Sequence, residues 1–137
     1  MSKLVPPHGG KGLVCCLLEG KALEDELQKA KGLKQIEISS RAKGDLIMMG
    51  IGGFSPLDGF MDKANWKSVC DNMLLTDGTF WPVPITMDIS AEDAKDIKPG
   101  QEVTLVRNGT IYATMKVSEC YEMTDEDKKY ECEKVFK

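Results

Sequence analysis

The chain has 137 residues, of which 42% are hydrophobic, and this length and composition predict one globular domain spanning residues 1–137. Its 22 acidic residues outnumber its 18 Lys and Arg residues, so the formal net charge is −4. This charge removes the main electrostatic force for general nucleic-acid binding and leaves open only a local basic patch. The sequence contains no run of 18 apolar residues, which predicts a cytoplasmic protein without a membrane partner.

The first third of the chain combines an irregular arm with helical and extended segments. Residues 1–12 contain two prolines and three glycines and predict a flexible arm. Apolar residues at i, i+4 and i+7 predict a helix over 21–33, which Gly32 ends. The alternation over 35–39 predicts a short strand, and a second helix is expected over about 42–49.

The next helix has the strongest amphipathic pattern. Asp62 can cap its N-terminus. An apolar stripe at i, i+3, i+4 and i+7 predicts core positions at Trp66, Val69, Cys70 and Met73. The segment 75–84 contains the turn pair Asp77-Gly78 and two prolines, and it leads into a predicted strand over 85–89.

The last third of the chain is predicted to be mainly β, between two short helical segments. Ser90 can cap a short helix, and Lys98-Pro99-Gly100 predicts the turn after it. Asn108-Gly109 lies between two alternating apolar segments and predicts a two-residue hairpin. Thr124 can cap a final helix. This mixture predicts an α+β fold with a small antiparallel barrel or curled sheet.

The glycine-rich segment 50–53 and the five cysteines could suggest ligand sites, but their spacing does not fit. The dinucleotide fingerprint requires glycine where Ser55 stands, and no Gly-Lys pair has the first glycine of a P-loop. No two cysteines have the C-x2-C spacing of a zinc site. An odd number of cysteines, with Cys15 and Cys16 adjacent, predicts reduced thiols in small apolar environments. We therefore predict no metal and no cofactor site in this chain.

Catalytic groups are scarce as well. Arginine occurs only as Arg41 and Arg107, and the single histidine, His8, lies in the predicted arm. A site for polyanionic substrates is usually built from several converging cations. The sequence therefore predicts no catalytic residue.

The segment 50–61 crowds four glycines and one proline together with apolar side chains, which predicts a tight loop that packs rather than reacts. Its sequence GGFSPLDGFM, followed by LLTDGTFWPVPITMDIS, closely resembles the N-terminal domain of the ATP sulfurylase (sulfate adenylyltransferase) family. The stretches ISSRAKGDLIMMG, KPGQEVTL and VFK fit the same family, so that the resemblance covers about residues 30–137.

The resemblance implies a PUA-like domain, a small β-barrel with flanking helices, which precedes a nucleotidyltransferase domain. Members of the family transfer the adenylyl group of ATP to sulfate with magnesium, which gives adenosine 5′-phosphosulfate (APS) and pyrophosphate. The Gln-Thr-Arg-Asn-Pro and His-Pro motifs of the catalytic domain are absent from this chain. The resemblance therefore implies a structural or docking domain that is inactive alone, with ATP and magnesium bound elsewhere in the full-length enzyme.

The expected partners are the catalytic domain of the same polypeptide and further copies in a homo-oligomer. A 137-residue domain has limited means to cover a cluster of large apolar side chains by itself. We therefore predict that the cluster in the loop contributes to interdomain docking: Phe54, Leu57, Phe60 and Met61. Two alternatives stay open. The four side chains could all be internal core, and the chain could be a stand-alone PUA-like module that binds RNA or a small ligand.

Overall fold

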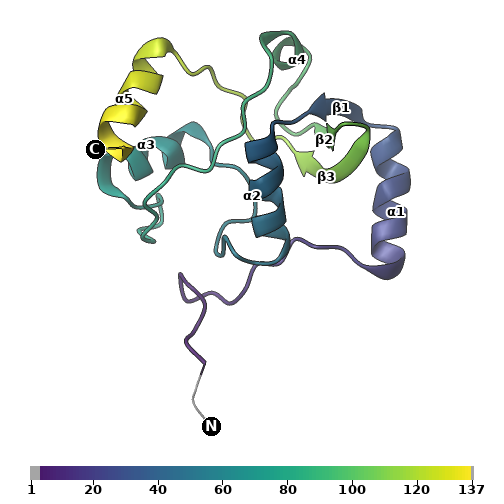
Figure 1. The fold of residues 1–137 in the computed structure, drawn as a ribbon, viewed down its shortest axis with the longest axis horizontal. Coiled ribbons are helices and arrows are strands. Elements are labelled where there is room, and N and C mark those ends of the chain that lie inside the picture. Colours follow the sequence, from purple (N-terminus) through teal and green to yellow (C-terminus); the bar gives the residue numbers. More distant parts are fainter. Residues whose placement is uncertain (1–3, 137) are drawn as a thin grey trace. The chain divides into compact units, whose positions relative to one another are not determined.

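The computed structural model describes residues 4–136 (Figure 1). The chain forms two compact units. Unit 1 consists of Met1–Gly59 and Glu102–Lys116, and unit 2 consists of Phe60–Gln101 and Val117–Lys137. The first segment of unit 2 is thus inserted between the two segments of unit 1, and its second segment follows the hairpin of β2 and β3.

Unit 1 is a three-stranded sheet with two helices. Its elements are α1 (Gly20–Lys31), β1 (Lys34–Glu37), α2 (Ser40–Gly50), β2 (Glu102–Arg107) and β3 (Thr110–Lys116). The strand order is β1-β2-β3, with β2 antiparallel to β3 and parallel to β1. The predicted antiparallel sheet is therefore correct for the hairpin and wrong for β1, because the long connection between β1 and β2 permits a crossover.

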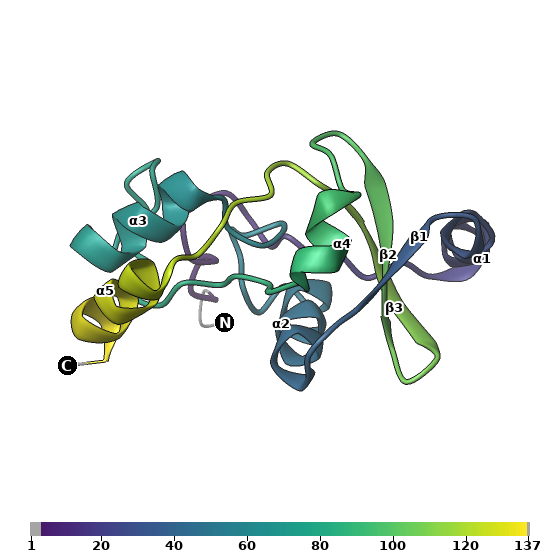
Figure 2. The same cartoon turned by 90° about the horizontal axis from the view of Figure 1, so that it is seen from above.

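The central strand β2 is buried on both faces. Figure 2 shows the sheet between α1 and α2. Val103, Thr104 and Leu105 are consecutive residues, and each is 0% exposed. Thr104 satisfies its hydroxyl by donating a hydrogen bond to the carbonyl oxygen of Ala30, near the end of α1 (2.7 Å). The alternation of apolar and polar residues along β2 predicts that only one face of the strand is buried. Thr104 is buried as well because a helix covers each face of the sheet.

The hairpin between β2 and β3 confirms the prediction at Asn108-Gly109. Both residues have positive φ, 49° for Asn108 and 78° for Gly109, as a type I′ turn requires. The first central residue also donates its backbone N–H to the Glu37 carboxylate (3.0 Å), which connects the turn to β1.

Unit 2 contains three helices: α3 (Lys63–Asn72), α4 (Ala91–Lys95) and α5 (Asp125–Val135). All three predicted caps are confirmed, because the side chains of Asp62, Ser90 and Thr124 each accept a backbone hydrogen bond in the first turn. Trp66 and Val69 are buried at 2% and 1% exposure. The core of unit 2 is built around this face of α3.

Two predictions for unit 2 are wrong. Met73 is 50% exposed, because α3 ends at Asn72 and Met73 turns the chain with a left-handed φ of 55°. The helical stripe therefore stops one residue too early to include it. The segment 85–89 is not a strand. The carbonyl oxygen of Ile85 accepts from the N–H of Met61 (2.8 Å), but the Ile85 N–H meets the Met61 sulfur instead of a second carbonyl, so no ladder forms.

The α+β class is confirmed by these elements. Residues 4–12 contain no helix or strand, in agreement with an irregular arm; the first three residues of the predicted arm lie outside the described part. Within residues 4–136, no helix has the length and apolar character that a bilayer crossing requires.

Candidate docking surface

The loop after α2 begins with three backbone amides that point back into the helix. The N–H groups of Ile51, Gly52 and Gly53 donate to the carbonyl oxygens of Ile47, Met49 and Met48, respectively, over 3.1, 3.2 and 2.8 Å. These donors are used by the helix C-terminus and do not form an anion cradle.

Gly52 is required for the close approach of another segment. Its φ is +79°, and a Cβ atom at this position would lie 2.9 Å from the sulfur of Cys15. Any side chain would therefore be strained and would displace the segment that precedes α1.

Ser55 holds this preceding segment against the loop. Its hydroxyl accepts from the N–H of Val14 (2.9 Å) and donates to the carbonyl oxygen of Gly52 (2.7 Å), and the residue is 6% exposed. Two backbone bonds of 3.2 Å extend the pairing, from Cys16 N to Met49 O and from Leu17 N to Gly50 O. Residues 14–17 are thus fixed along the end of α2.

The four residues predicted to dock have different surroundings. Phe54 and Leu57 belong to unit 1 and are half-buried, whereas Phe60, also half-buried, belongs to unit 2. Met61 is 6% exposed, and its backbone and sulfur contact Ile85 within unit 2. The Met61 side chain is therefore used inside its own unit, and the docking role of the set stays a prediction.

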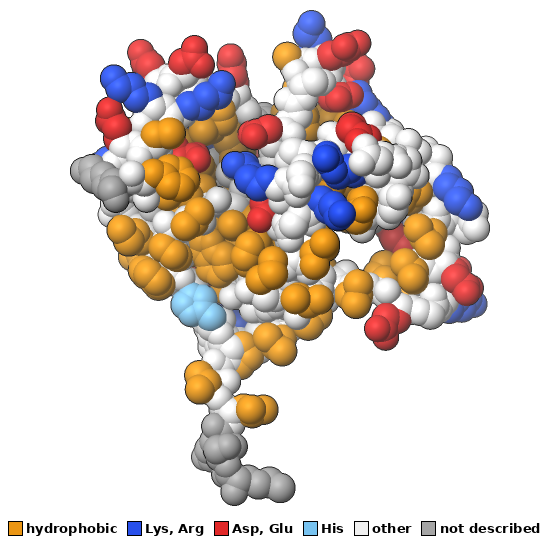
Figure 3. Space-filling view, viewed as in Figure 1, with side chains coloured by type: hydrophobic (Ala, Val, Ile, Leu, Met, Phe, Trp, Pro, Cys, Tyr) orange, Lys and Arg blue, Asp and Glu red, His pale blue; other side chains and the backbone are white. Residues whose placement is uncertain are grey.

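A larger exposed set lies beside the loop in unit 1, and we call it the apolar patch. It consists of Leu13 (66% exposed), Leu17 (63%), Ile47 (50%), Met48 (36%) and Ile51 (61%). Three of these side chains lie close to glycines of the loop. A Cβ atom on Gly50, Gly52 or Gly53 would lie 3.9 Å from Leu17, 3.6 Å from Leu13 or 2.5 Å from Met48, respectively. Figure 3 shows hydrophobic side chains along the region below α2, where the preceding segment passes.

The sequence contains a signal for this patch that apolar periodicity does not reveal. Residues 12–18 and 46–57 contain no charged side chain, although 29% of the chain is charged. The second stretch also places Leu46, Ile47, Met48 and Met49 in succession on a helix, where they cannot all face one side. Only Met49 of this run is fully buried.

Two thiols lie near the patch, and one of them and a nearby carboxylate have perturbed pKa values. Cys15 and Cys16 are free and exposed. Burial raises the pKa of the Cys16 thiol, and the neighbouring Asp58 and Cys15 add to this shift. Burial also raises the pKa of Asp45, against the opposing effect of Arg41. A raised thiol pKa makes a weaker nucleophile near neutral pH.

The prediction of buried cysteines is correct for one residue of five. Cys70 is buried, whereas Cys15, Cys16, Cys120 and Cys132 are exposed. The four exposed thiols lie outside regular apolar stripes, so the apolar periodicity of the sequence does not predict whether they are buried or exposed. Within the described residues, no three Cys, His, Asp or Glu side chains converge as a metal site would require.

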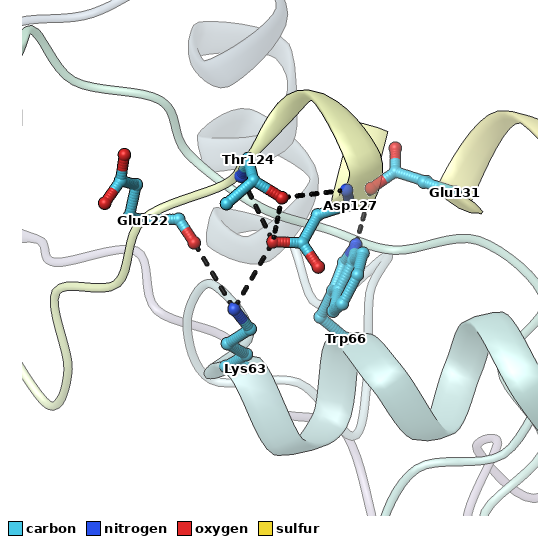
Figure 4. Close-up of polar contacts among 6 residues, drawn as sticks. All are labelled: Lys63, Trp66, Glu122, Thr124, Asp127 and Glu131. Carbon is cyan, nitrogen blue, oxygen red and sulfur yellow. Dashed lines mark hydrogen bonds and ion pairs between the residues drawn. The ribbon is translucent and has the colours of Figure 1, made fainter. Parts of the chain in front are cut away.

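The densest polar cluster joins α3 to α5 in unit 2 (Figure 4). The Lys63 ammonium contacts the Asp127 carboxylate and the Glu122 carbonyl, each at 3.4 Å. Asp127 also accepts from the backbone and hydroxyl of Thr124, and these hydrogen bonds, with Lys63, hold its pKa below the ordinary value. Trp66 donates its ring N–H to Glu131 (2.5 Å). Every group in this cluster has a role in capping or helix pairing, which makes the cluster structural.

One of the two arginines has a structural contact. Arg107 donates from its guanidinium to the carbonyl oxygen of Ile38 (2.9 Å), which connects β2 to the end of β1. Arg41 lies on α2, and His8 lies in the arm. The mixed sheet with its two covering helices and the helices of unit 2 thus define a small α+β scaffold.

The class of this scaffold is established by comparison with known families. The family model described as "PUA-like domain" matches residues 5–137, so one match extends through both units, and the chain belongs to this family. The PUA-like fold predicted from the resemblance is therefore confirmed.

The relatives are consistent about the kind of polypeptide in which this domain occurs. A sulfate adenylyltransferase of Desulfovibrio desulfuricans is 79% identical over 137 residues, which are 100% of this chain and 32% of the relative. A sulfate adenylyltransferase of Entamoeba histolytica is 51% identical over 99% of this chain and 33% of the relative. The chain thus spans about a third of the length of these relatives.

A solved structure supports the same fold. The structure described as "Hexameric APS kinase from Thiobacillus denitrificans" superposes with a TM-score of 0.77 at 30% identity, over 90% of this chain and 24% of that chain. In this structure too, the matching region is a minor part of a longer polypeptide.

Proposed function

We propose that the chain is the PUA-like domain of a cytoplasmic sulfate adenylyltransferase and that it supports the enzyme without supplying a catalytic group. The observation that carries this proposal is the 79% identity along the whole chain to a sulfate adenylyltransferase of which it matches only 32%. Domains this similar keep their fold and surfaces, and the remaining two thirds of the polypeptide have room for a reaction centre.

The chemistry of the reaction supports the division of labour. Transfer of the adenylyl group from ATP to sulfate brings two polyanions together, and several cations must offset their repulsion. This chain has two arginines, and one of them is used to hold β1 and β2 together. Magnesium and ATP therefore belong to the remainder of the enzyme in this proposal.

A replacement experiment tests the proposal. The matching third of the Desulfovibrio desulfuricans enzyme is exchanged for this chain, and ATP formation from APS and pyrophosphate is measured. We expect the chimera to retain activity and the chain alone to have none. An inactive but folded chimera, or turnover by the chain alone, would contradict the proposal.

The same preparation tests the alternative of an RNA-binding module. The net charge of −4 predicts that the chain is not retained on RNA at moderate salt. Salt-sensitive retention, together with an inactive chimera, would favour the binding module instead.

A further inference from the structure

The apolar patch consists of five large side chains of unit 1 that stay exposed to solvent. Ile47, Met48 and Ile51 lie at the end of α2, and Leu13 and Leu17 lie on the segment hydrogen-bonded to it. The backbone of this region is paired, since the N–H groups of Cys16 and Leu17 donate to the carbonyl oxygens of Met49 and Gly50, and yet the five side chains stay exposed.

The composition of the surface is that of an interface centre. Charged residues are depleted where one protein surface is buried on another, whereas Met and large apolar residues are common there. The two segments that form the patch, 12–18 and 46–57, contain no charged residue. A solvent-exposed surface formed by two segments of this length would be expected to contain several charged residues.

The size of the patch distinguishes between two occupants. A stable complex of separate proteins buries about 20–30 residues on each side. Five partly exposed side chains are far fewer, and a second free copy would be held weakly. A covalently linked domain needs much less surface, because the linker keeps its effective concentration at roughly the millimolar level.

We infer that the apolar patch is where the rest of the same polypeptide docks, through an apolar surface of its own. This inference rests on the proposed function, since the relatives named sulfate adenylyltransferase have about two thirds of their length outside the matching region. It moves the main docking contacts from Phe60 and Met61 to Leu13, Leu17 and Ile51. The inference therefore predicts shielding at the end of α2.

The cysteines of the chain provide the measurement. Cys15 and Cys16 are exposed beside the patch, and trypsin releases both on the peptide 12–21. Cys120 and Cys132 are exposed in unit 2 and are released on peptides 117–128 and 130–134, so they serve as internal references. Iodoacetamide labelling at pH 8 is followed by mass spectrometry for the chain alone and for the chimera described above.

We expect peptide 12–21 to be alkylated at least about tenfold more slowly in the chimera than in the chain alone, with the two reference peptides unchanged. Equal rates for peptide 12–21 in the two proteins would overturn the inference. A uniform slowing of all three peptides would also overturn it, because the shielding would not be specific to the patch.

A matched pair of variants sharpens the result. Ile51→Asp in the chimera places a charge in the patch and should restore rapid alkylation of peptide 12–21. Leu23→Asp changes an exposed leucine of α1 (41% exposed) and should leave the protection intact. The readout does not depend on catalysis: an inactive chimera with a protected peptide contradicts the proposed function alone, whereas an active chimera without protection contradicts the docking inference alone.

Discussion

Helices α2 and α3 both have large apolar side chains, and those of α3 are covered more completely. On α3, Trp66 is 2% exposed and is overlaid by α5, which supplies the Glu131 hydrogen bond and a tilted aromatic contact from Tyr130 at 6.3 Å. On α2, Ile47 and Met48 are 50% and 36% exposed. The difference lies in the segment that packs against each helix.

The covering helix α5 is almost entirely polar and contributes no buried residue of its own. The side of α5 that faces α3 shields it through polar contacts, and the other charged side chains of α5 lie in water. The end of α2 is paired instead with the uncharged residues 14–17, which close the backbone hydrogen bonds and add further apolar surface. Of the two helices, α2 is therefore the one whose large apolar side chains stay exposed beside an uncharged segment, although unit 2 has exposed apolar residues elsewhere, such as Phe80 and Phe136.

The largest expected effect tests the covered helix. Trp66→Ala should lower the free energy of unfolding by about 3–5 kcal/mol, the usual cost of removing a buried aromatic side chain. Trp66→Phe keeps most of the volume but loses the hydrogen bond to Glu131, and it should cost about 1–2 kcal/mol. Urea unfolding measures both, and an unchanged midpoint for the alanine variant would show that α3 is not covered.

The second prediction tests whether the stability of unit 1 comes from its sheet. Gly109→Val places a β-branched residue at a φ of 78° and should cost about 1–3 kcal/mol. A Cβ at this position meets nothing within 4 Å, so backbone strain alone causes the loss. Asn108→Gly relaxes the same turn and serves as the control. If both variants unfold at the wild-type urea concentration, the hairpin does not limit stability.

The third prediction concerns the attachment of α5. Thr124→Ala removes the capping box and should cost about 1 kcal/mol. Thr124→Ser keeps the hydroxyl and should restore most of the loss. Thermal unfolding followed by circular dichroism measures the melting temperatures of the two variants. Equal melting temperatures would mean that the Thr124 cap does not stabilise α5 and its packing on α3.

The fourth prediction uses two ionisable groups of unit 2, the buried Cys70 of α3 and the half-buried Tyr121. Burial, with Glu131 and Asp71, raises the pKa of Cys70 from 9.0 to about 11. Burial also raises the pKa of Tyr121, whose hydroxyl donates to the carbonyl oxygen of Met61 (3.0 Å). The folded state therefore retains protons that the unfolded state releases, and stability should fall as the pH rises from about 9 to about 11.

Urea midpoints at pH 8 and pH 10.5 measure this decline. Cys70→Ala removes the thiol contribution and should reduce the difference between the two midpoints. A midpoint that is independent of pH over this range would contradict the burial of both groups.

Patterns of neighbouring residues predicted most of the helices, caps and turns in both units. They did not predict features that depend on contacts between segments far apart in the sequence. The caps at Asp62, Ser90 and Thr124 and the Asn108-Gly109 turn depend on neighbouring residues only, and all were predicted. The parallel pairing of β1, by contrast, depends on a strand nearly 70 residues away, which periodicity does not report.

The docking surface was harder to predict for the same reason. The sequence indicated a packed apolar loop, and the loop is there, but which side chains remain exposed depends on the segment 13–17 that Ser55 holds in place. Phe54 and Leu57 are half-buried, while Leu13 and Ile51 beside them are more exposed. The sequence did contain one signal for the exposed apolar side chains, which is the absence of charged residues over 12–18 and 46–57. Apolar periodicity indicates which residues form the core, whereas this absence of charge indicates an apolar surface.

The central claim is that the patch serves a partner domain and not the stability of this chain, and Ile51→Asp tests it most directly. In the chain alone, Ile51 is 61% exposed, so the substitution should change the free energy of unfolding by no more than about 0.5 kcal/mol. In the chimera with the Desulfovibrio desulfuricans relative, the same substitution should lower adenylyl transfer several-fold, while Leu23→Asp leaves it unchanged. Activity that is the same for both variants and the unsubstituted chimera would contradict the account.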